Sequence, residues 1–298
     1  MTPGAAGTNC STTKNYSSRF SLTIANPLQG NQIDGSGAGS TLVADSATGN
    51  YNGLVASLNH RLSSTFSLLA NWTWSKCLDE EDGQGDLSGV SVQNPANIRG
   101  DYGPCGFDFR HVINTVVVAK SNFSRFNRVE KMFINNWEIA PLMHIVSGAP
   151  VNVTAGADNS LTDNNQDRPN LIPGVNPYAE VKFNRATGEA NREYLNPAAF
   201  AEICPGNVTQ GCTAAGTFGN ISKNAFRGTP SLQLDSQISR IFPIHETFNL
   251  DLRLEAFNLL NHPNFGAPNA SVASTSFGQI SSQSNAARVF QGAIKFSF

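Results

Sequence analysis

Carboxylate and amide side chains gather in one segment at a spacing that suits a hard cation. The members of this cluster are Asp158, Asp163, Asn165 and Asp167. Calcium favours flexible loops that offer several such oxygens, so we take them as a candidate structural calcium site, with an ordinary Asn/Asp turn as the alternative. The acidic run 79–82, with Asp86, lacks the order of an EF-hand, and we interpret it as a solvated loop in preference to a cation site.

The cysteines offer a second chemistry. They are Cys10, Cys77, Cys105, Cys204 and Cys212. No CxxC pair and no histidine at zinc spacing accompanies them, which favours disulfides over structural zinc. Cys77 ends an expected strand and Cys105 precedes the next, so we predict a Cys77–Cys105 disulfide. Cys204 and Cys212 lie close together in one long connection and form the second predicted pair. Cys10 is then unpaired or linked to sequence outside this chain.

No constellation typical of catalysis follows from the remaining polar residues. The five histidines do not pair with one another, or with cysteines or carboxylates, at recognised metal spacing, and no serine lies in a GxSxG motif. The glycine-rich run 35–40 lacks the lysine and the helix of a phosphate loop. A net charge of −2 gives no electrostatic reason to expect nucleic acid. We therefore expect no enzyme activity and no cofactor apart from calcium.

The elements that would position these residues show a period of two. In segment 248–256 the even positions are apolar and the odd positions are polar or charged, which predicts a strand with one apolar face. Segments 231–242 and 290–298 alternate in the same way. The polar face of these strands could line a lumen. Its candidate residues are Gln233, Asp235, Gln237, Asp251, Arg253 and Glu255.

Long and short connections alternate along the chain. About eight strands are expected, as in a segment of a β-barrel. Their expected ranges are 14–25, 51–62, 64–77, 107–119, 132–147, 231–242, 246–258 and the C-terminal segment. The long connections are 26–50, 78–106, 148–230 and 261–285. In an antiparallel meander this order puts every long connection at one end, as in outer-membrane barrels, and no helical period is expected.

The sequence predicts neither a transmembrane helix nor a signal peptide. No stretch approaches about eighteen consecutive apolar residues. The first residues lack a basic and an apolar region, so either the protein is cytoplasmic or its true N-terminus is missing.

Several short motifs give a resemblance to a known family. They are Tyr51-Asn52-Gly53-Leu54, Trp72-Thr73-Trp74-Ser75-Lys76, Phe107-Asp108-Phe109-Arg110-His111, Asp167-Arg168-Pro169-Asn170, Asn196-Pro197-Ala198-Ala199-Phe200, Gly216-Thr217-Phe218-Gly219-Asn220, Arg227-Gly228 and the run 255–266. In this order, from about residue 51 to the end, the chain resembles Oar-like TonB-dependent receptors, which are outer-membrane barrels filled by a plug.

The resemblance implies a fold class and a set of partners. Residues 1–298 would be the C-terminal part of a transmembrane antiparallel β-barrel with long extracellular loops, incomplete without upstream strands and a plug. The implied partners are outer-membrane lipid, those upstream parts, TonB through missing N-terminal sequence, and the barrel-assembly machinery through Phe296 and Phe298. The implied function is to bind or move a large substrate. The alternatives are a structural or adhesive outer-membrane protein and a soluble all-β binding module.

Two finer expectations concern register and aromatic residues. A short turn at 243–245 would place Phe242 opposite Glu246, and hence Asp235 opposite Arg253 and Gln237 opposite Asp251. In that arrangement the even positions of segment 248–256 face lipid. The tryptophans Trp72, Trp74 and Trp137 fall near expected strand ends and suit an aromatic belt, with a carbohydrate platform as the alternative.

Overall fold

The computed structural model describes most of the chain from residue 47 onward. The described residues are 47–61, 63–81, 92–94, 97–157, 159–160, 167–180, 183–184, 189–190, 193–201, 216–244 and 248–297. The expected strand 14–25, the glycine-rich run 35–40 and Asp86 lie outside these ranges.

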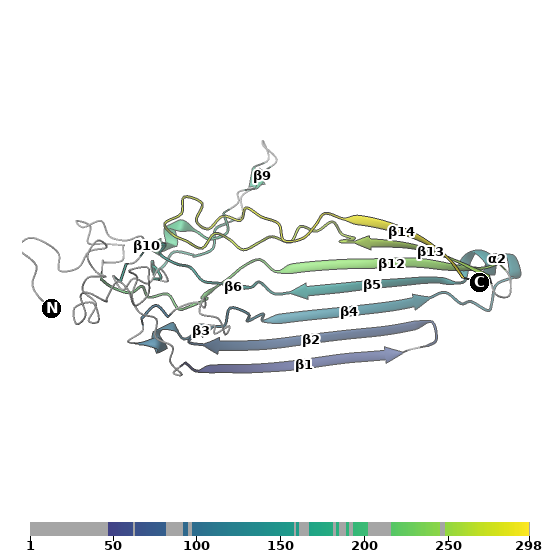
Figure 1. Cartoon of the computed structure of the whole chain (residues 1–298), viewed down its shortest axis with the longest axis horizontal. Helices are drawn as coiled ribbons and strands as arrows, with labels where there is room; N and C mark the ends of the chain where they lie inside the picture. Colours follow the sequence, from purple (N-terminus) through teal and green to yellow (C-terminus); the bar gives the residue numbers. More distant parts are fainter. Residues whose placement is uncertain are drawn as a thin grey trace, which may run out of the picture.

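One antiparallel sheet dominates the structure (Figure 1). It has eight strands, and its path runs through β1 (Gly49–Arg61), β2 (Phe66–Asp79), β4 (His111–Lys120), β5 (Trp137–Val146), β12 (Ser231–Pro243), β13 (Asn249–Phe257) and β14 (Val289–Ser297). The short β3 (Gly103–Pro104) pairs with the end of β2. Each strand of the path pairs with its neighbour along the chain, which confirms the predicted meander. The sheet does not close: β1 and β14 form its edges, and all their described residues are exposed.

The two faces of the sheet differ in composition. Residues opposite each other in an antiparallel pair point to the same side, so the register of every pair assigns each residue to a face. One face, the apolar face, is almost continuous in large hydrophobic side chains. Its members include Leu54, Leu58, Leu68, Trp72, Trp74, Ile113, Val117, Trp137, Ile139, Met143, Leu234, Ile238, Leu252, Leu254, Ile294 and Phe296. The three predicted belt tryptophans all stand on this face.

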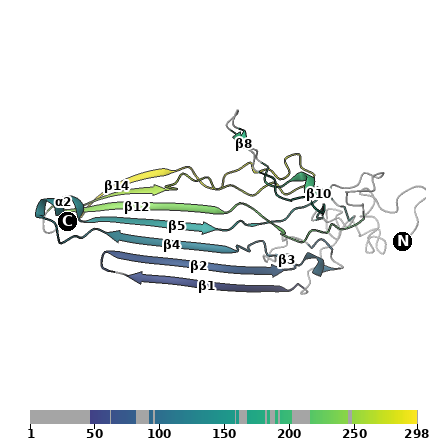
Figure 2. The same cartoon turned by 180° about the vertical axis from the view of Figure 1, so that it is seen from behind.

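Long and short connections lie at opposite ends of the sheet. The connections after β2, β5 and β13 lie at one end, here called the loop end, whereas the short connections and the C-terminus lie at the other, the turn end (Figure 1). Figure 2 shows the same division from behind. This alternation is the one predicted. Among the described helices, none has the length and apolar character needed to cross a membrane.

The turn end contains a helix that the sequence reading missed. The expected strand 132–147 begins only at Trp137, because α2 (Arg128–Ile134) precedes it. A capping box starts this helix: the Asn127 side chain accepts from the Glu130 backbone N–H, and the Glu130 carboxylate accepts from the Asn127 N–H. The helix is too short for hydrophobic periodicity to reveal, but its capping residues were readable.

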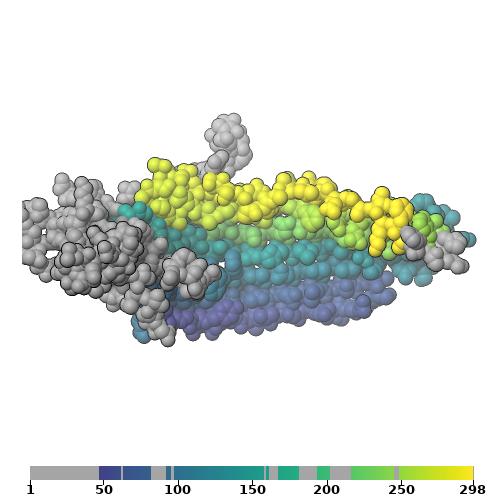
Figure 3. Space-filling model, in the orientation of Figure 1, coloured from purple at the N-terminus to yellow at the C-terminus, as the bar shows by residue number. Residues whose placement is uncertain are grey.

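The connections at the loop end fold together around their own apolar core. The core side chains are Val151, Val153, Leu195, Ala199, Phe200, Ile221, Phe226 and Phe277. Short strand pairs support it: β6 (Pro150–Val151) with β11 (Phe226–Arg227), and β7 (Asn170–Leu171) with β10 (Phe200–Ala201). A further pair, β8 (Phe183–Asn184) with β9 (Glu189–Ala190), extends away from the sheet in Figure 1. The region expected to be a plain connection is therefore a packed assembly. In Figure 3 the strands of the main sheet lie as adjacent coloured bands.

The predicted register of the β12–β13 hairpin is wrong. Phe242 lies opposite Leu250, Gln237 opposite Glu255 and Ser239 opposite Arg253. Pairing continues past Pro243, because the Ile244 N–H donates to the Phe248 carbonyl at 2.9 Å and moves the turn toward the C-terminus. The shift places two apolar residues opposite each other on the apolar face.

Asp235 and Arg253, the predicted cross-strand charge pair, do not lie opposite each other in this register. Arg253 approaches Asp251 and Glu255 of its own strand, at 3.6 and 3.8 Å. Asp235 instead accepts from the backbone N–H of Asn258 and from Gln233. Since the register moved by an even number of residues, every side chain keeps the face that was predicted for it.

Candidate functional site

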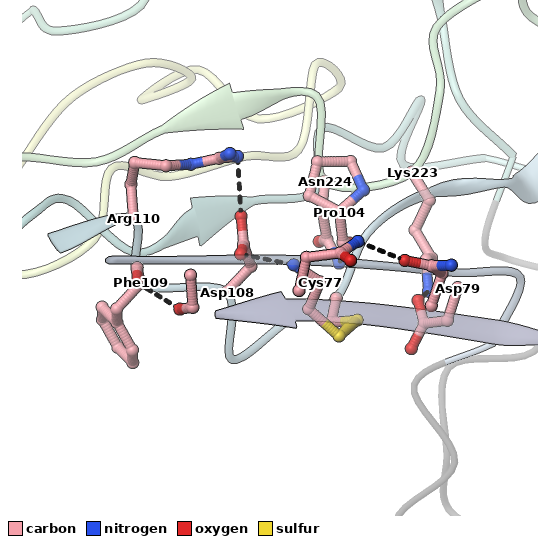
Figure 4. The surroundings of a disulfide bond; sticks show 12 residues. Cys77, Asp79, Pro104, Asp108, Phe109, Arg110, Lys223 and Asn224 are labelled. Carbon is pink, nitrogen blue, oxygen red and sulfur yellow. Dashed lines mark hydrogen bonds and ion pairs between the residues drawn. A yellow bond between two sulfur atoms is a disulfide. The ribbon is translucent and has the colours of Figure 1, made fainter. Parts of the chain in front are cut away.

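The predicted disulfide between Cys77 and Cys105 is present at the loop end (Figure 4). Cys77 is a buried residue two positions before the end of β2, and Cys105 follows β3 directly, so the β2–β3 pairing brings their Cα atoms to 5.4 Å. Asp79 lies close enough to both sulfurs to suggest a metal cluster, but the disulfide occupies both sulfur atoms. The predicted partner residues Cys204 and Cys212, like Cys10, lie outside the described residues.

Asp108 connects the disulfide region to the distant β11. Its buried carboxylate accepts from the Cys77 backbone N–H at 2.8 Å and from Arg110 at 3.1 Å. The same carboxylate pairs with Arg227, which also donates to the Asp108 carbonyl. A buried carboxylate requires such charge-assisted partners. The Phe107–His111 and Arg227-Gly228 motifs therefore meet in one structural junction.

A tyrosine pair holds Arg227 from the other side. The Tyr194 hydroxyl donates to the Arg227 carbonyl at 2.9 Å, and the Tyr178 hydroxyl accepts from the Arg227 N–H at 3.0 Å. The two rings meet edge to face, with centroids 5.7 Å apart. Burial raises the pKa of Tyr194, and the neighbouring Tyr178 raises it further.

Lys223 makes a second long-range junction, which no pattern in the sequence indicates. Its buried ammonium pairs with Asp79 at the end of β2, 144 residues away in the sequence (Figure 4). The adjacent Asn224 has a positive φ of 53° and donates from its side chain to the Pro104 carbonyl at 2.8 Å. Together these residues seat segment 223–224 on β3 and the disulfide.

Arg168 makes a third junction, almost wholly out of solvent. Its guanidinium pairs with buried Asp101 and donates to the Ile221 carbonyl at 2.7 Å. Gln93 completes the group, since its side chain accepts from the Arg168 N–H and its own N–H donates to Asp101. The Asp167–Asn170 motif thus joins the connection after β2 to the connection after β5.

The structure describes only one member of the predicted calcium cluster. Asp167 is fully buried: its carboxylate accepts from the Ser160 N–H at 2.5 Å, and its carbonyl accepts from the Ala155 N–H at 2.6 Å. Asp158, Asp163 and Asn165 lie outside the described residues. The calcium site stays a prediction.

The six residues predicted to face a lumen share one face of the sheet. Gln233, Asp235 and Gln237 of β12 lie on the same side as Asp251, Arg253 and Glu255 of β13, opposite the apolar face. A row of amide and imidazole groups crosses this polar face. It consists of Asn71, Asn114, His144 and Gln233, and His144 Nδ1 lies 2.6 Å from Asn114 Oδ1.

An apolar row crosses the same face beside the polar one. Leu69, Val116 and Leu142 lie opposite one another on β2, β4 and β5. Leu69 is 41% exposed and Leu142 is 44% exposed, although the surface around them is polar. In the sequence, Leu69 was visible only as a break in the alternation of its strand.

These features define a class of protein. A single antiparallel layer with one continuous apolar face, and with elaborate connections at only one end, is the design of an outer-membrane β-barrel, in which the apolar face contacts lipid. A family model described as an outer membrane beta barrel domain matches residues 3–291, and the chain belongs to this family. The protein is therefore one of the bacterial outer membrane, which sets aside a soluble binding module. No curated protein matches the chain.

Proposed function

We propose that this chain forms the C-terminal part of the barrel of an Oar-like TonB-dependent receptor, which binds or moves a large substrate. The apolar row of Leu69, Val116 and Leu142 carries the proposal. A water-filled pore has a polar interior, and exposed leucines there would be unfavourable. A plug packed on the row would remove these side chains from water, and burying one such side chain contributes about 1.5–3 kcal/mol.

The open edges of the sheet support the same arrangement. In lipid the unpaired backbone groups of β1 and β14 need partners, which upstream strands of a larger barrel would supply. Phe296, on the apolar face of β14, would belong with Phe298 to the segment read by the barrel-assembly machinery. TonB would act through sequence upstream of this chain, and the proposal assigns no catalytic residue.

Cysteine labelling of the full-length receptor tests whether a plug covers the apolar row. Leu142→Cys is compared with Leu252→Cys, whose side chain stands on the apolar face, and both are measured above the parent protein's labelling. With a membrane-impermeant thiol reagent, Leu142→Cys should label slowly when the plug is present and rapidly when the plug is deleted. Leu252→Cys should resist the reagent in both proteins. Equal labelling of Leu142→Cys with and without the plug would contradict the proposal.

The packed loop end favours a second candidate function, which is display of a fixed surface by an adhesive or structural outer-membrane protein. Its buried core and its disulfide give the connections a defined shape without any transport role. Energy dependence separates the two functions. Ligand accumulation by cells that stops when TonB is deleted supports the receptor, whereas surface attachment that is unchanged by this deletion supports display.

A further inference from the structure

One arginine stands on the apolar face of the sheet. Arg240 lies on β12 opposite Trp137 and Leu252, among residues that contact lipid in this class of protein. Only 7% of its surface is exposed, and its guanidinium carbon lies 5.1 Å from the Trp137 ring centroid and 4.3 Å from that of Phe242. Two aromatic rings therefore fix the position of this cation.

No acceptor within the described part of the chain neutralises this guanidinium. Its Nε is buried without a hydrogen-bond partner, and no ion pair of Arg240 is found among the described residues. Arg168, Arg227 and Arg253 each pair with a carboxylate. A charge left alone beside lipid is costly, so the position suits an anion that is not among the described residues.

The place of Arg240 along the strand sets its depth in the membrane. It lies near Pro243, the last residue of β12, at the turn end that faces the periplasm in outer-membrane barrels. Trp137 is the first residue of β5, and its Nε1 donates to the Phe133 carbonyl of α2 at 2.9 Å. Tryptophan at this position is typical of the boundary between acyl chains and headgroups.

The adjacent helix also suits this boundary. Val129, Met132 and Phe133 share one side of α2 and are 67%, 66% and 64% exposed. Arg128 borders that side, next to Met132 on the helix surface, whereas Lys131 lies opposite it. An amphipathic helix of this kind lies in the membrane surface with its apolar side among acyl chains. The helix therefore continues the lipid contact of the sheet at the level of the inner-leaflet headgroups.

We propose that Arg240 binds the phosphate of an inner-leaflet phospholipid. A guanidinium forms paired hydrogen bonds to phosphate oxygens, and the contacts of Arg240 with the Trp137 and Phe242 rings preset its position. The continuous apolar surface of the sheet and α2 selects a lipid over free phosphate, because acyl chains would cover that surface. The proposal rests on the outer-membrane location and is independent of the receptor function.

Native mass spectrometry of the delipidated full-length protein tests the site. The lipid probe is phosphatidylglycerol, and the comparison probes are diacylglycerol with the same acyl chains and inorganic phosphate. Arg240→Gln should weaken retention of phosphatidylglycerol by about tenfold or more, since hydrogen bonds to charged groups are the strong ones. Arg288→Gln is the matched control. Arg288 also lies over an aromatic ring, but it directly precedes β14 at the loop end, away from the proposed site.

The outcomes separate the sources of the ligand. The proposal predicts retention of phosphatidylglycerol but not diacylglycerol by the parent protein, with loss in Arg240→Gln alone. Equal retention of the two lipids by the parent protein would overturn it, even if the Arg240→Gln variant failed to assemble. Displacement of phosphatidylglycerol by inorganic phosphate at similar concentration would show that the acyl chains contribute nothing, and would overturn the lipid assignment.

Discussion

Replacing Asp108 by asparagine should loosen the loop end while leaving the strands intact. The substitution keeps the acceptor for the Cys77 N–H but removes the charge that pairs with Arg110 and Arg227. Breaking a buried ion pair costs about 3–5 kcal/mol. Both arginine side chains are about one-third exposed and regain water, at 31% and 28%. We therefore expect a loss of about 2–3 kcal/mol, which corresponds to roughly 30–150-fold more frequent opening.

Hydrogen exchange of the full-length protein measures this opening segment by segment. Protection should fall across β11 and the residues following β3, and stay unchanged in β12 and β13. Asp251→Asn is the control, because it also removes one carboxylate charge but lies on the polar face, 3.6 Å from Arg253. Equal protection of β11 in Asp108→Asn and in Asp251→Asn, or a uniform rise of exchange over the strands, would contradict this expectation.

Further tests address the disulfide, a close backbone approach and alkaline pH. Replacing Cys77 and Cys105 together by serine should destabilise the loop end by about 2–4 kcal/mol, measured by proteolysis of the connection after β2; unchanged cleavage would contradict this. Gly148→Ala should lower the free energy of unfolding by about 1–3 kcal/mol in a thermal melt, because the added Cβ would overlap the Gly228 carbonyl. A melting temperature equal to that of the parent protein would contradict this expectation. The pKa of Tyr194 is raised in the folded protein, so the protonated hydroxyl stabilises the fold. This stabilisation is complete below about pH 10 and is lost as the pH rises further. Loop-end protection should then fall in alkali less in Tyr194→Phe than in the parent, and identical profiles would argue against it.

Local patterns predicted the strands and their faces well. Alternation in 248–256 is a property of neighbouring residues, and the side that each residue takes does not depend on the exact partner strand. The predicted register is wrong because Asp235 and Arg253 each have a closer partner, which is the Asn258 backbone N–H for Asp235 and Asp251 for Arg253. Only the hydrogen bonds of the turn decide between such registers.

The junctions of the loop end could not be predicted in the same way. Lys223 and Asp79 are 144 residues apart, and Arg168 and Asp101 are 67 residues apart, so no spacing rule connects them. The Cys77–Cys105 pair was accessible because both residues border neighbouring strands at the same end. The apolar row of the polar face needed the register of three strands before Leu69 and Leu142 could be seen as neighbours.

The cross-links of the loop end restrict how this part of the barrel can change width. Arg168 with Asp101 ties the connection after β2 to the one after β5. The bridge between Thr154 and Ser271 ties the connection after β5 to the one after β13. Strands β2 to β14 therefore share one stiff arc at the rim and cannot splay independently. Any dilation of the mouth must move this arc as a single body, or arise where its edge strands meet the rest of the barrel wall.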